Sequence, residues 1–241
     1  MRPPRGERVT IAGAAGDIEA LVELPRADEP TRAVPLAVLG GRADFAHFGV
    51  ICHPHPLYGG TLDNKVVYTL ARAFVELGVP AIRFNFRGVG GSSGRYDEGR
   101  GESADVLAVT AYGRGRWPGA SPWLAGFSFG GAVALRAAAQ ARPATLIAVA
   151  PGITRVAMEG VGSPSCPWLI VQGNADEVIE PSAVLAWARH QSMPPAVRLL
   201  SGAGHFFHGR LHELRQVVLD FLREQDIRPR SPEGPQAPSG Q

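Results

Sequence analysis

Short apolar runs alternate with segments of helical periodicity along most of the chain. A run of about four to eight apolar residues is typical of a buried strand, whereas apolar residues that recur every three or four positions indicate a helix. The clearest helix covers 62–77, where Val66, Leu70 and Phe74 share one face and Gly78 stands where a glycine commonly ends a helix. By these criteria we expect strands at 8–12, 17–24, 47–53, 79–86, 122–127, 144–150, 167–173 and 196–202, and helices at 62–77, 102–114, 131–141, 181–191 and 206–225.

This alternation defines the expected fold class. Strands that are apolar throughout are buried on both faces, which indicates a mostly parallel sheet flanked by helices on both faces. We therefore predict an α/β protein with a single domain over residues 1–226. Residues 25–44 are expected to form a loop, and the proline-rich tail 227–241 is expected to be disordered because it cannot build a core. In such a sheet ligands bind beyond the carboxyl ends of the strands, so chemistry is expected in the loops that follow strands.

Composition and charge narrow the classes of partner. Hydrophobic residues make up 45% of the 241 residues and charged residues 19%, which fits a folded globular protein. The formal net charge is +2, Lys65 is the only lysine and the arginines are scattered, which argues against nucleic acid or an anionic membrane as the main partner. No apolar run approaches the ~20 residues of a membrane span, and the first residues lack the apolar region of a signal peptide. We expect a soluble, cytoplasmic protein.

The strongest chemical signal is the sequence Gly126-Phe127-Ser128-Phe129-Gly130. It follows an apolar strand directly and precedes an alanine-rich helix, which is the context in which G-x-S-x-G forms a nucleophile elbow. Residues two positions on either side of the serine crowd such a turn, so they must be very small, and both are glycine. The helix that follows adds positive potential where an oxyanion would form. We predict Ser128 as a nucleophile.

A serine nucleophile needs a base and a group that orients the base. In elbows of this kind the partners follow in the order Ser, acid, His. His205 follows the strand at 196–202 through a short turn and is expected to open the last helix. Asp176 lies just past the strand at 167–173 and is the predicted acid. Glu177 and Glu180 are rivals, but Asp176 is nearest the strand end, and the apolar residues Val178 and Ile179 that follow could pack its loop down.

The oxyanion hole requires two backbone N–H donors. One is expected from Phe129, the residue after the nucleophile, and the other from a loop after an earlier strand. The tetrapeptide His53-Pro54-His55-Pro56 follows the strand at 47–53, and proline has no N–H. Because His53 is expected to be still in the strand, we assign the second donor to His55.

Two weaker signals concern metals and phosphate. His205, His208 and His212 have a spacing that fits one helix face, but Gly209 stands where a zinc-protease motif needs Glu, and no second cluster completes a ligand set. The glycines at 88–91 follow a strand but lack a P-loop lysine, so we interpret them as a tight turn. We expect no metal and no cofactor.

Three further residues receive structural interpretations. Arg87 is expected to be an ion-pair partner. Cys52 and Cys166 are too few for a disulfide framework, and neither lies in a C-x-x-C motif. We expect both thiols to be buried like small apolar side chains.

These motifs together resemble the α/β-hydrolase superfamily, and most closely its small bacterial members of the dienelactone-hydrolase and lidless carboxylesterase type. The resemblance extends from the strand before His53 to the final helix, with HPHP, GFSFG, QGNADEVI and GAGHFF in the expected order and HPHPLYGG, DNKVV and FNFRGVGGSSG as further landmarks. It implies hydrolysis of an ester through an acyl-enzyme, with Ser128, Asp176 and His205 as the triad. The usual HG-type oxyanion loop is replaced here by HPHP.

The sequence limits the expected size of the substrate but leaves more than one type of reaction open. The connection at 151–167, where members of this fold insert a cap, is too short for a packed cap of two or more helices. We therefore expect an open pocket that accepts small, soluble esters. Its expected lining is Leu57, Tyr58, Phe129, Val178 and Phe206. A peptidase or thioesterase on the same triad is an alternative, as is a non-catalytic ligand-binding protein, although a receptor has no need of all three triad residues.

Overall fold

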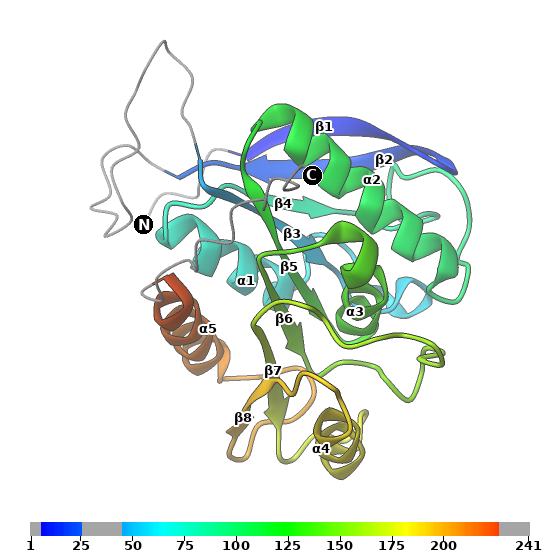
Figure 1. Ribbon diagram of the computed structural model, residues 1–241. Helices are drawn as coiled ribbons and strands as arrows, with labels where there is room; N and C mark the ends of the chain where they lie inside the picture. Colours follow the sequence, from blue (N-terminus) through cyan, green and yellow to red (C-terminus); the bar gives the residue numbers. More distant parts are fainter. Residues whose placement is uncertain (1–5, 26–44, 227–241) are drawn as a thin grey trace, which may run out of the picture.

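The described residues, 6–25 and 45–226, fold around an eight-stranded sheet in this computed structural model (Figure 1). The strand order is β1-β2-β4-β3-β5-β6-β7-β8; β2 is antiparallel to β1 and β4, and every pair from β4 to β8 is parallel. The strands are β1 (Gly6–Gly13), β2 (Gly16–Glu23), β3 (His47–Cys52), β4 (Ala81–Phe84), β5 (Ser121–Phe127), β6 (Thr145–Val149), β7 (Trp168–Gly173) and β8 (Ala196–Leu200). The predicted mostly parallel α/β sheet is confirmed, whereas the predicted loop at 25–44 (beyond Pro25) and the predicted tail at 227–241 lie outside the described residues.

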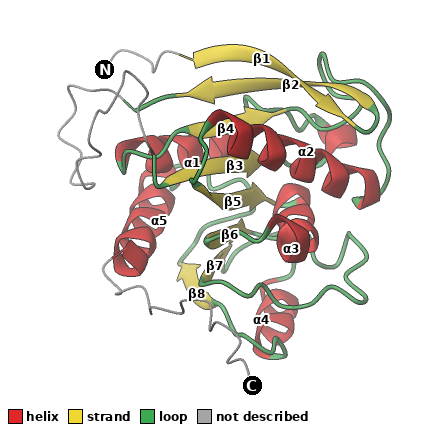
Figure 2. Ribbon diagram, turned by 45° about the horizontal axis from the view of Figure 1, so that its top comes forward, coloured by secondary structure: helices red, strands yellow, loops and turns green. Residues whose placement is uncertain are grey.

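Helices cover both faces of the sheet (Figures 1 and 2). On one face α1 (Lys65–Glu76) packs beside α5 (Leu211–Asp226). The other face is covered by α2 (Arg100–Arg116), α3 (Phe129–Ala141) and α4 (Pro181–Arg189). Each face has its own cluster of buried side chains, so the sheet separates two hydrophobic layers.

The central strands are apolar throughout because both of their faces are buried. In β3, Val50 packs in the layer between the sheet and α2 and α3, and Ile51 packs in the layer between the sheet and α1 and α5. In β5, Leu124 belongs to the first of these layers and Ala125 to the second. Successive side chains of a strand point to opposite faces. A strand with helices on both sides therefore needs an apolar residue at nearly every position, which produces the runs seen in the sequence.

Two element boundaries differ from the prediction in ways that affect the site. The strand predicted at 47–53 ends at Cys52, so His53 lies beyond it. The helix predicted from residue 206 begins at Leu211, because Phe207 has a φ of 50°, outside the helical range, and the chain makes two turns before the helix starts. The expectation that His205 opens a helix is therefore wrong, and His205, His208 and His212 do not share a helix face.

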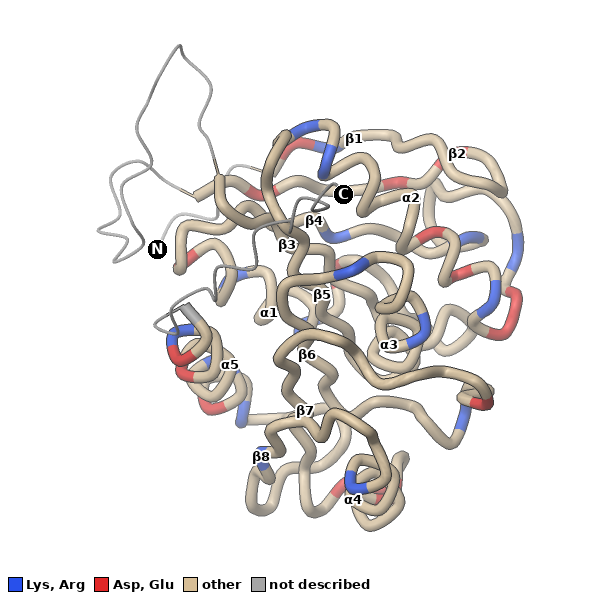
Figure 3. Tube along the Cα trace, in the orientation of Figure 1, with Lys and Arg blue, Asp and Glu red and all other residues tan. Residues whose placement is uncertain are grey.

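Acidic and basic side chains occur together on α2 and α5, as the charge-coloured trace shows (Figure 3). None of the helices in the described part of the chain combines the length and apolar character that a bilayer crossing requires. Because the strands from β4 to β8 all run the same way, the loops that follow them open at one edge of the sheet. The predicted site residues lie in these loops.

Candidate active site

Ser128 occupies a sharp turn between β5 and α3. The strand ends at Phe127, the helix begins at Phe129, and Ser128 between them has φ 55° and ψ −119°. A residue other than glycine is strained at this φ, and such strain is concentrated at functional sites. Ser128 is half-buried although its neighbours on both sides are buried. The turn thus has the backbone conformation expected of a nucleophile elbow.

The glycines on either side of this turn are required by close backbone contacts. A Cβ atom on Gly126 would lie 2.2 Å from the carbonyl oxygen of Gly130. A Cβ atom on Gly130 would lie 2.4 Å from the carbonyl oxygens of Cys52 and His53. Any side chain at either position would push α3 away from the ends of β5 and β3. The first turn of α3 therefore packs directly against the loop that follows β3.

His205 lies in the loop after β8 and reaches Ser128. Its Nε2 atom is 3.0 Å from Ser128 Oγ, and its ring packs at 5.1 Å from the ring of Phe127 and at the same distance from the ring of Phe206. The side chain is 3% exposed. A buried imidazole in contact with two phenyl rings has little room to turn away from the hydroxyl.

Asp176 holds the other nitrogen of this imidazole. Asp176 Oδ2 lies 2.9 Å from His205 Nδ1, while Oδ1 accepts hydrogen bonds from the N–H groups of Val178 and Ile179. Burial acts to raise the pKa of Asp176, but the hydrogen bonds from His205, Ile179 and Val178 outweigh it, so the pKa of this carboxyl is lowered. Because an ionised carboxylate only accepts, Nδ1 carries the proton and Nε2 presents its lone pair to Ser128.

The sequence reasoning missed Gln172, which also binds the carboxylate. This residue of β7 is fully buried, and its Nε2 donates to Asp176 Oδ2 at 2.8 Å. Its Oε1 atom is buried and has no hydrogen-bond partner among the described residues. A polar residue at the end of the otherwise apolar run WLIVQ was the available signal. Asp176 thus accepts four hydrogen bonds, counting those from Gln172, His205, Val178 and Ile179.

The two glutamates considered as rival acids have other partners. Glu177 Oε2 accepts a hydrogen bond from the backbone N–H of His205 at 3.1 Å, and this bond lowers the pKa of Glu177. Glu180 caps α4, where its carboxylate accepts from the N–H and the hydroxyl of Ser182. Asp176 is therefore the carboxylate that lies against the His205 ring, whereas Glu177 anchors the backbone of the same loop.

The loop after β3 is fixed by His53, whose part in the site was not anticipated. Its Nδ1 lies 2.6 Å from the carbonyl oxygen of Pro54, and its Nε2 accepts a hydrogen bond from the N–H of Phe86 at 3.0 Å. Both contacts require the neutral ring with the proton on Nδ1. The ring is fully buried, and burial lowers the pKa of His53 to about 4.

A second anchor holds the far end of the same loop. The N–H of Leu62 donates to Asn85 Oδ1 at 2.8 Å, and its carbonyl oxygen accepts from the guanidinium of Arg83 at 2.6 Å. Arg83 is itself buried and paired with Glu23 of β2 at 2.7 Å. The segment between His53 and Leu62 is therefore tied at both ends to residues 83–86, at and just beyond the end of β4.

His55 and Phe129, the residues assigned as oxyanion donors, are in contact through their side chains. Phe129 is the first residue of α3, where helix geometry leaves the N–H without a partner inside the helix. The His55 ring lies 5.0 Å from the Phe129 ring, and Gly130 packs against the backbone of Cys52 and His53. The structure thus brings the loop of His55 against the residue that follows Ser128.

The predicted pocket residues lie on the surface around this centre. Leu57 is 67% exposed, Tyr58 86%, Val178 38% and Phe206 44%, which are unusually high values for apolar side chains. They come from the loops after β3, β7 and β8. Between β6 and β7, residues 150–167 contain turns but neither helix nor strand, so no helical cap is built there. Phe129, in contrast, is 2% exposed and contributes to the core.

The remaining predicted features have structural partners. Arg87 pairs with the buried Asp105 at 2.7 Å, as expected of an ion-pair residue. Cys52 and Cys166 are both buried and unpaired, and burial raises the pKa of each thiol. His208, once considered as a metal ligand, lies 2.8 Å from Lys65 Nζ. No group of three or more His, Cys, Asp or Glu side chains suited to a metal ion occurs in residues 6–25 and 45–226.

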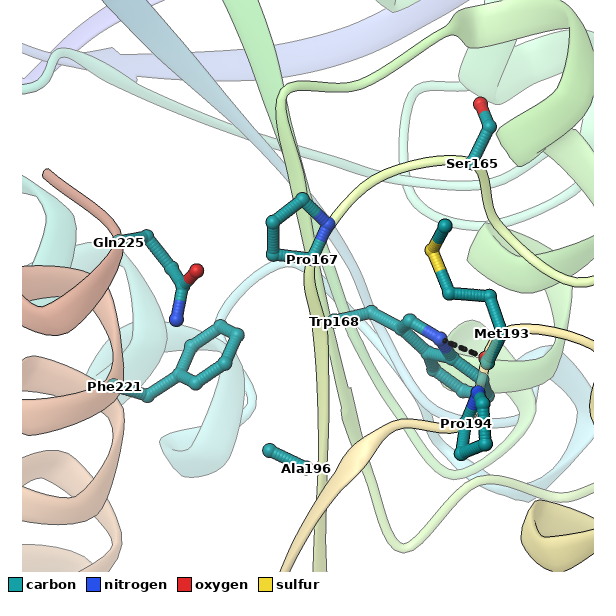
Figure 4. A pocket seen from close by; sticks show the side chains of 8 residues that line it. All are labelled: Ser165, Pro167, Trp168, Met193, Pro194, Ala196, Phe221 and Gln225. Carbon is teal, nitrogen blue, oxygen red and sulfur yellow. Dashed lines mark hydrogen bonds between the residues drawn. The ribbon is translucent and has the colours of Figure 1, made fainter. Parts of the chain in front are cut away.

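A pocket of about 370 Å³ lies at the opposite edge of the sheet (Figure 4). Its lining includes Trp168 and Ala196, the first residues of β7 and β8, whereas the loop of Ser128 follows the carboxyl end of β5. None of the residues that line the pocket has a titratable side chain; they are Ser165, Pro167, Trp168, Met193, Pro194, Ala196, Phe221 and Gln225. The lining of this pocket therefore offers no group for acid–base chemistry, and no base that could activate the hydroxyl of Ser165.

Comparison with known proteins places this fold and site in a class. No family model matches the chain. A solved structure from Xanthomonas campestris, XC6422, described as an α/β serine hydrolase without lid, is 37% identical, with a TM-score of 0.82 over 93% of this chain and 96% of that one. An α/β serine hydrolase homologue from Coxiella burnetii is 41% identical, with a TM-score of 0.81 over 92% of this chain and 100% of that one.

A curated relative supports the same relationship. An uncharacterised protein of Rickettsia prowazekii is 31% identical over 188 residues, which cover 73% of this chain and 79% of that protein. With the geometry above, these similarities show that the chain belongs to the α/β-hydrolase superfamily. Within that superfamily it is a hydrolase, and its described residues build no helical cap between β6 and β7.

Proposed function

We propose that the protein hydrolyses small carboxylic esters through an acyl-enzyme, with Ser128 as the nucleophile. The observation that carries this proposal is the continuous contact from Ser128 Oγ to His205 Nε2 (3.0 Å) and from His205 Nδ1 to Asp176 Oδ2 (2.9 Å). It occurs at a strained turn whose flanking glycines cannot be replaced without a clash. Nucleophile, base and orienting acid in this arrangement are the components of a catalytic triad.

Acylation follows from the protonation states at these atoms. Ser128 Oγ attacks the ester carbonyl carbon while its proton passes to His205 Nε2, and the carbonyl π electrons move onto oxygen. The N–H groups of Phe129 and His55 would stabilise this oxyanion. When the carbonyl re-forms, the bond to the alcohol oxygen breaks, and His205 donates its proton to that oxygen. Asp176 stabilises the transient imidazolium and remains ionised throughout.

Deacylation repeats these steps with water. His205 takes a proton from a water molecule as the water oxygen attacks the acyl carbon. The second oxyanion collapses, the bond from carbon to Ser128 Oγ breaks, and Oγ regains a proton from His205. One ester and one water thus give one alcohol and one carboxylic acid, with no cofactor in the cycle.

The same triad could serve a thioesterase or a peptidase, so substrate type is a separate question. The absence of a helical cap between β6 and β7 supports small, soluble substrates, because an exposed rim buries little of a long acyl chain. A purely ligand-binding role is less well supported, since binding alone does not require backbone strain at Ser128.

The deciding experiment is labelling with a fluorophosphonate, followed by peptide mapping and kinetics. We expect the reagent to modify Ser128, and Ser128→Ala to lose hydrolysis of p-nitrophenyl acetate by on the order of 10³-fold or more. Ser165→Ala is the matched control, because Ser165 is exposed and lines the pocket at the opposite edge of the sheet. Labelling of another residue, or full turnover in Ser128→Ala, would overturn the proposal. Acetyl thioesters and peptide anilides assayed in parallel test the alternatives.

A further inference from the structure

Four aromatic rings lie in contact with one another next to Ser128, and we call them the aromatic wall: His55, Tyr58, Tyr96 and the buried Phe129. The His55 ring lies at its centre, with centroids 4.7 Å from Tyr58, 4.9 Å from Tyr96 and 5.0 Å from Phe129. Tyr96 and Phe129 are 5.7 Å apart. The rings come from three segments: the loop after β3, the loop between β4 and α2, and the first residue of α3.

Burial decreases across the wall from its inner to its outer members. Phe129 is 2% exposed, His55 and Tyr96 are half-buried, and Tyr58 is 86% exposed with Leu57 beside it at 67%. Exposed apolar side chains that are contiguous with a buried cluster often mark a ligand site. Burial also lowers the pKa of His55 and raises that of Tyr96, so both rings are neutral near pH 7. The wall therefore presents uncharged aromatic surface to whatever lies against it.

The loop that carries the wall is anchored mainly by other groups. His53 and Leu62 tie it to residues 83–86 through buried hydrogen bonds at both ends, and His55 adds one bond within the loop, from the N–H of Leu57 to its Nδ1. Gly60 packs against the backbone of Pro54 so closely that a Cβ atom would lie 2.0 Å from its carbonyl oxygen. The almost fully exposed ring of Tyr58 adds little to this anchoring. The meeting of four aromatic rings is therefore more than the anchoring of the loop requires.

The location of the wall indicates which part of a substrate it would contact. In the proposed reaction three positions around the acyl carbon are assigned: Ser128 Oγ, the oxyanion at the N–H groups of Phe129 and His55, and the leaving oxygen near His205 Nε2. The acyl group takes the fourth position, directed away from His205. His55 and Phe129 carry the assigned oxyanion donors, so the aromatic wall lies on the side of the acyl carbon away from His205, which is the side toward which the acyl group extends. Phe206 packs on the His205 ring at 5.1 Å and so belongs to the leaving-group side.

We propose that the aromatic wall selects esters whose acyl group is itself a flat aromatic ring, such as a benzoyl group; this rests on the proposed ester hydrolysis. Aromatic rings gain from stacked and edge-to-face contact beyond the burial of area, by an amount that corresponds to about two- to tenfold in rate for a single ring pair. A saturated ring of similar size buries comparable area but lacks these contacts. The preference for aromatic over saturated acyl rings is therefore the property to measure.

The experiment compares kcat/KM for p-nitrophenyl benzoate and p-nitrophenyl cyclohexanecarboxylate, which share one leaving group. Each value is divided by the rate of hydroxide-catalysed hydrolysis of the same ester, and the ratio of the two quotients is the acyl preference. We expect the wild type to prefer benzoate at least about fivefold. Tyr96→Leu and Tyr58→Leu should each reduce this preference two- to fivefold, whereas Tyr96→Phe and Tyr58→Phe, which keep the rings, should retain it.

Phe206→Leu is the matched control, since it removes a ring from the leaving-group side and should leave the acyl preference unchanged. A wild-type preference near one, or a preference that neither leucine variant of the wall reduces, would overturn the inference. Collapse of the preference in Phe206→Leu alone would also overturn it, by placing the selective ring on the other side. If the wild type hydrolyses p-nitrophenyl acetate, these results bear on the wall alone; if it hydrolyses no ester, the proposed function fails instead.

Discussion

Gln172→Leu tests what the amide beside Asp176 contributes, because the structure predicts a small change in stability and a larger change in catalysis. In the native protein the Gln172 amide donates to Asp176 Oδ2 at 2.8 Å, beside the bond from His205 Nδ1 at 2.9 Å. The Oε1 atom of the same amide is buried without a partner in the described residues. Leucine removes both the donor and the unpaired acceptor while keeping a side chain of similar volume.

In the free energy of unfolding, the two effects of Gln172→Leu nearly cancel. Loss of a hydrogen bond to a charged group costs roughly 1.5–3 kcal/mol, and removal of a buried unsatisfied oxygen regains roughly 1–3 kcal/mol. The free energy of unfolding of Gln172→Leu should therefore stay within about 2 kcal/mol of the wild type. Urea denaturation with matched m-values measures this difference. The control is Gln191→Leu. It makes the same substitution just after α4, away from Ser128, and measures what the replacement of glutamine by leucine does to stability by itself.

Catalysis should change more than stability does. Without the amide, Asp176 Oδ2 keeps only the hydrogen bond from His205, so the carboxylate that orients the imidazole is held less firmly. The kcat/KM for p-nitrophenyl acetate should then fall by up to about tenfold, since about 1.4 kcal/mol corresponds to tenfold in rate and only part of the lost bond energy reaches the ring. An unchanged kcat/KM combined with a loss of more than about 3 kcal/mol in stability would refute this reasoning and make Gln172 a purely structural residue.

Three further predictions follow from the same geometry. Asp176→Asn should lower kcat by up to ~10⁴-fold because it selects the wrong His205 tautomer. In the same assay with p-nitrophenyl acetate, Glu177→Gln should change kcat only slightly. A large loss in Glu177→Gln beside a normal kcat in Asp176→Asn would show that Asp176 is not the acid of the triad. Burial lowers the pKa of His53 to about 4 in the folded protein, against an ordinary value of 6.5, so its contribution to the free energy of unfolding is complete above pH 6.5 and is lost as the pH falls toward 4. The free energy of unfolding, measured between pH 7 and pH 4.5, should therefore decrease with falling pH, and His53→Gln should reduce that decrease. An equal decrease in both proteins would contradict the neutral buried ring. Esters of increasing acyl length should show no jump in rate when the longer ones aggregate, and a sharp rise there would mean that part of the chain acts as a lid.

Much of the fold follows from local pattern. The apolar runs of β3, β5, β6 and β7 are explained by burial on both faces, and the resulting mostly parallel sheet is confirmed. The G-x-S-x-G turn is equally local, because the clash that excludes a side chain at Gly126 involves Gly130 only four residues away. The start of α5 could not be located in this way, because the positive φ of Phe207 leaves no mark in the hydrophobic period of the segment.

The contacts within the site could not be predicted from local sequence patterns, because they join residues that are far apart in the sequence. Ser128 and His205 are 77 positions apart and meet only because β5 and β8 deliver their loops to the same edge of the sheet. The bond from Phe86 to His53 spans 33 positions, and the aromatic wall joins three loops that no periodicity connects. The sequence by itself determined which residue types could do the chemistry, since nucleophile, base and acid need particular side chains. Only the tertiary structure decided that Gln172 binds Asp176, that His53 fixes the loop after β3 and that Tyr96 stands beside His55, because hydrogen bonds and ring contacts between distant segments depend on the packing of the whole sheet.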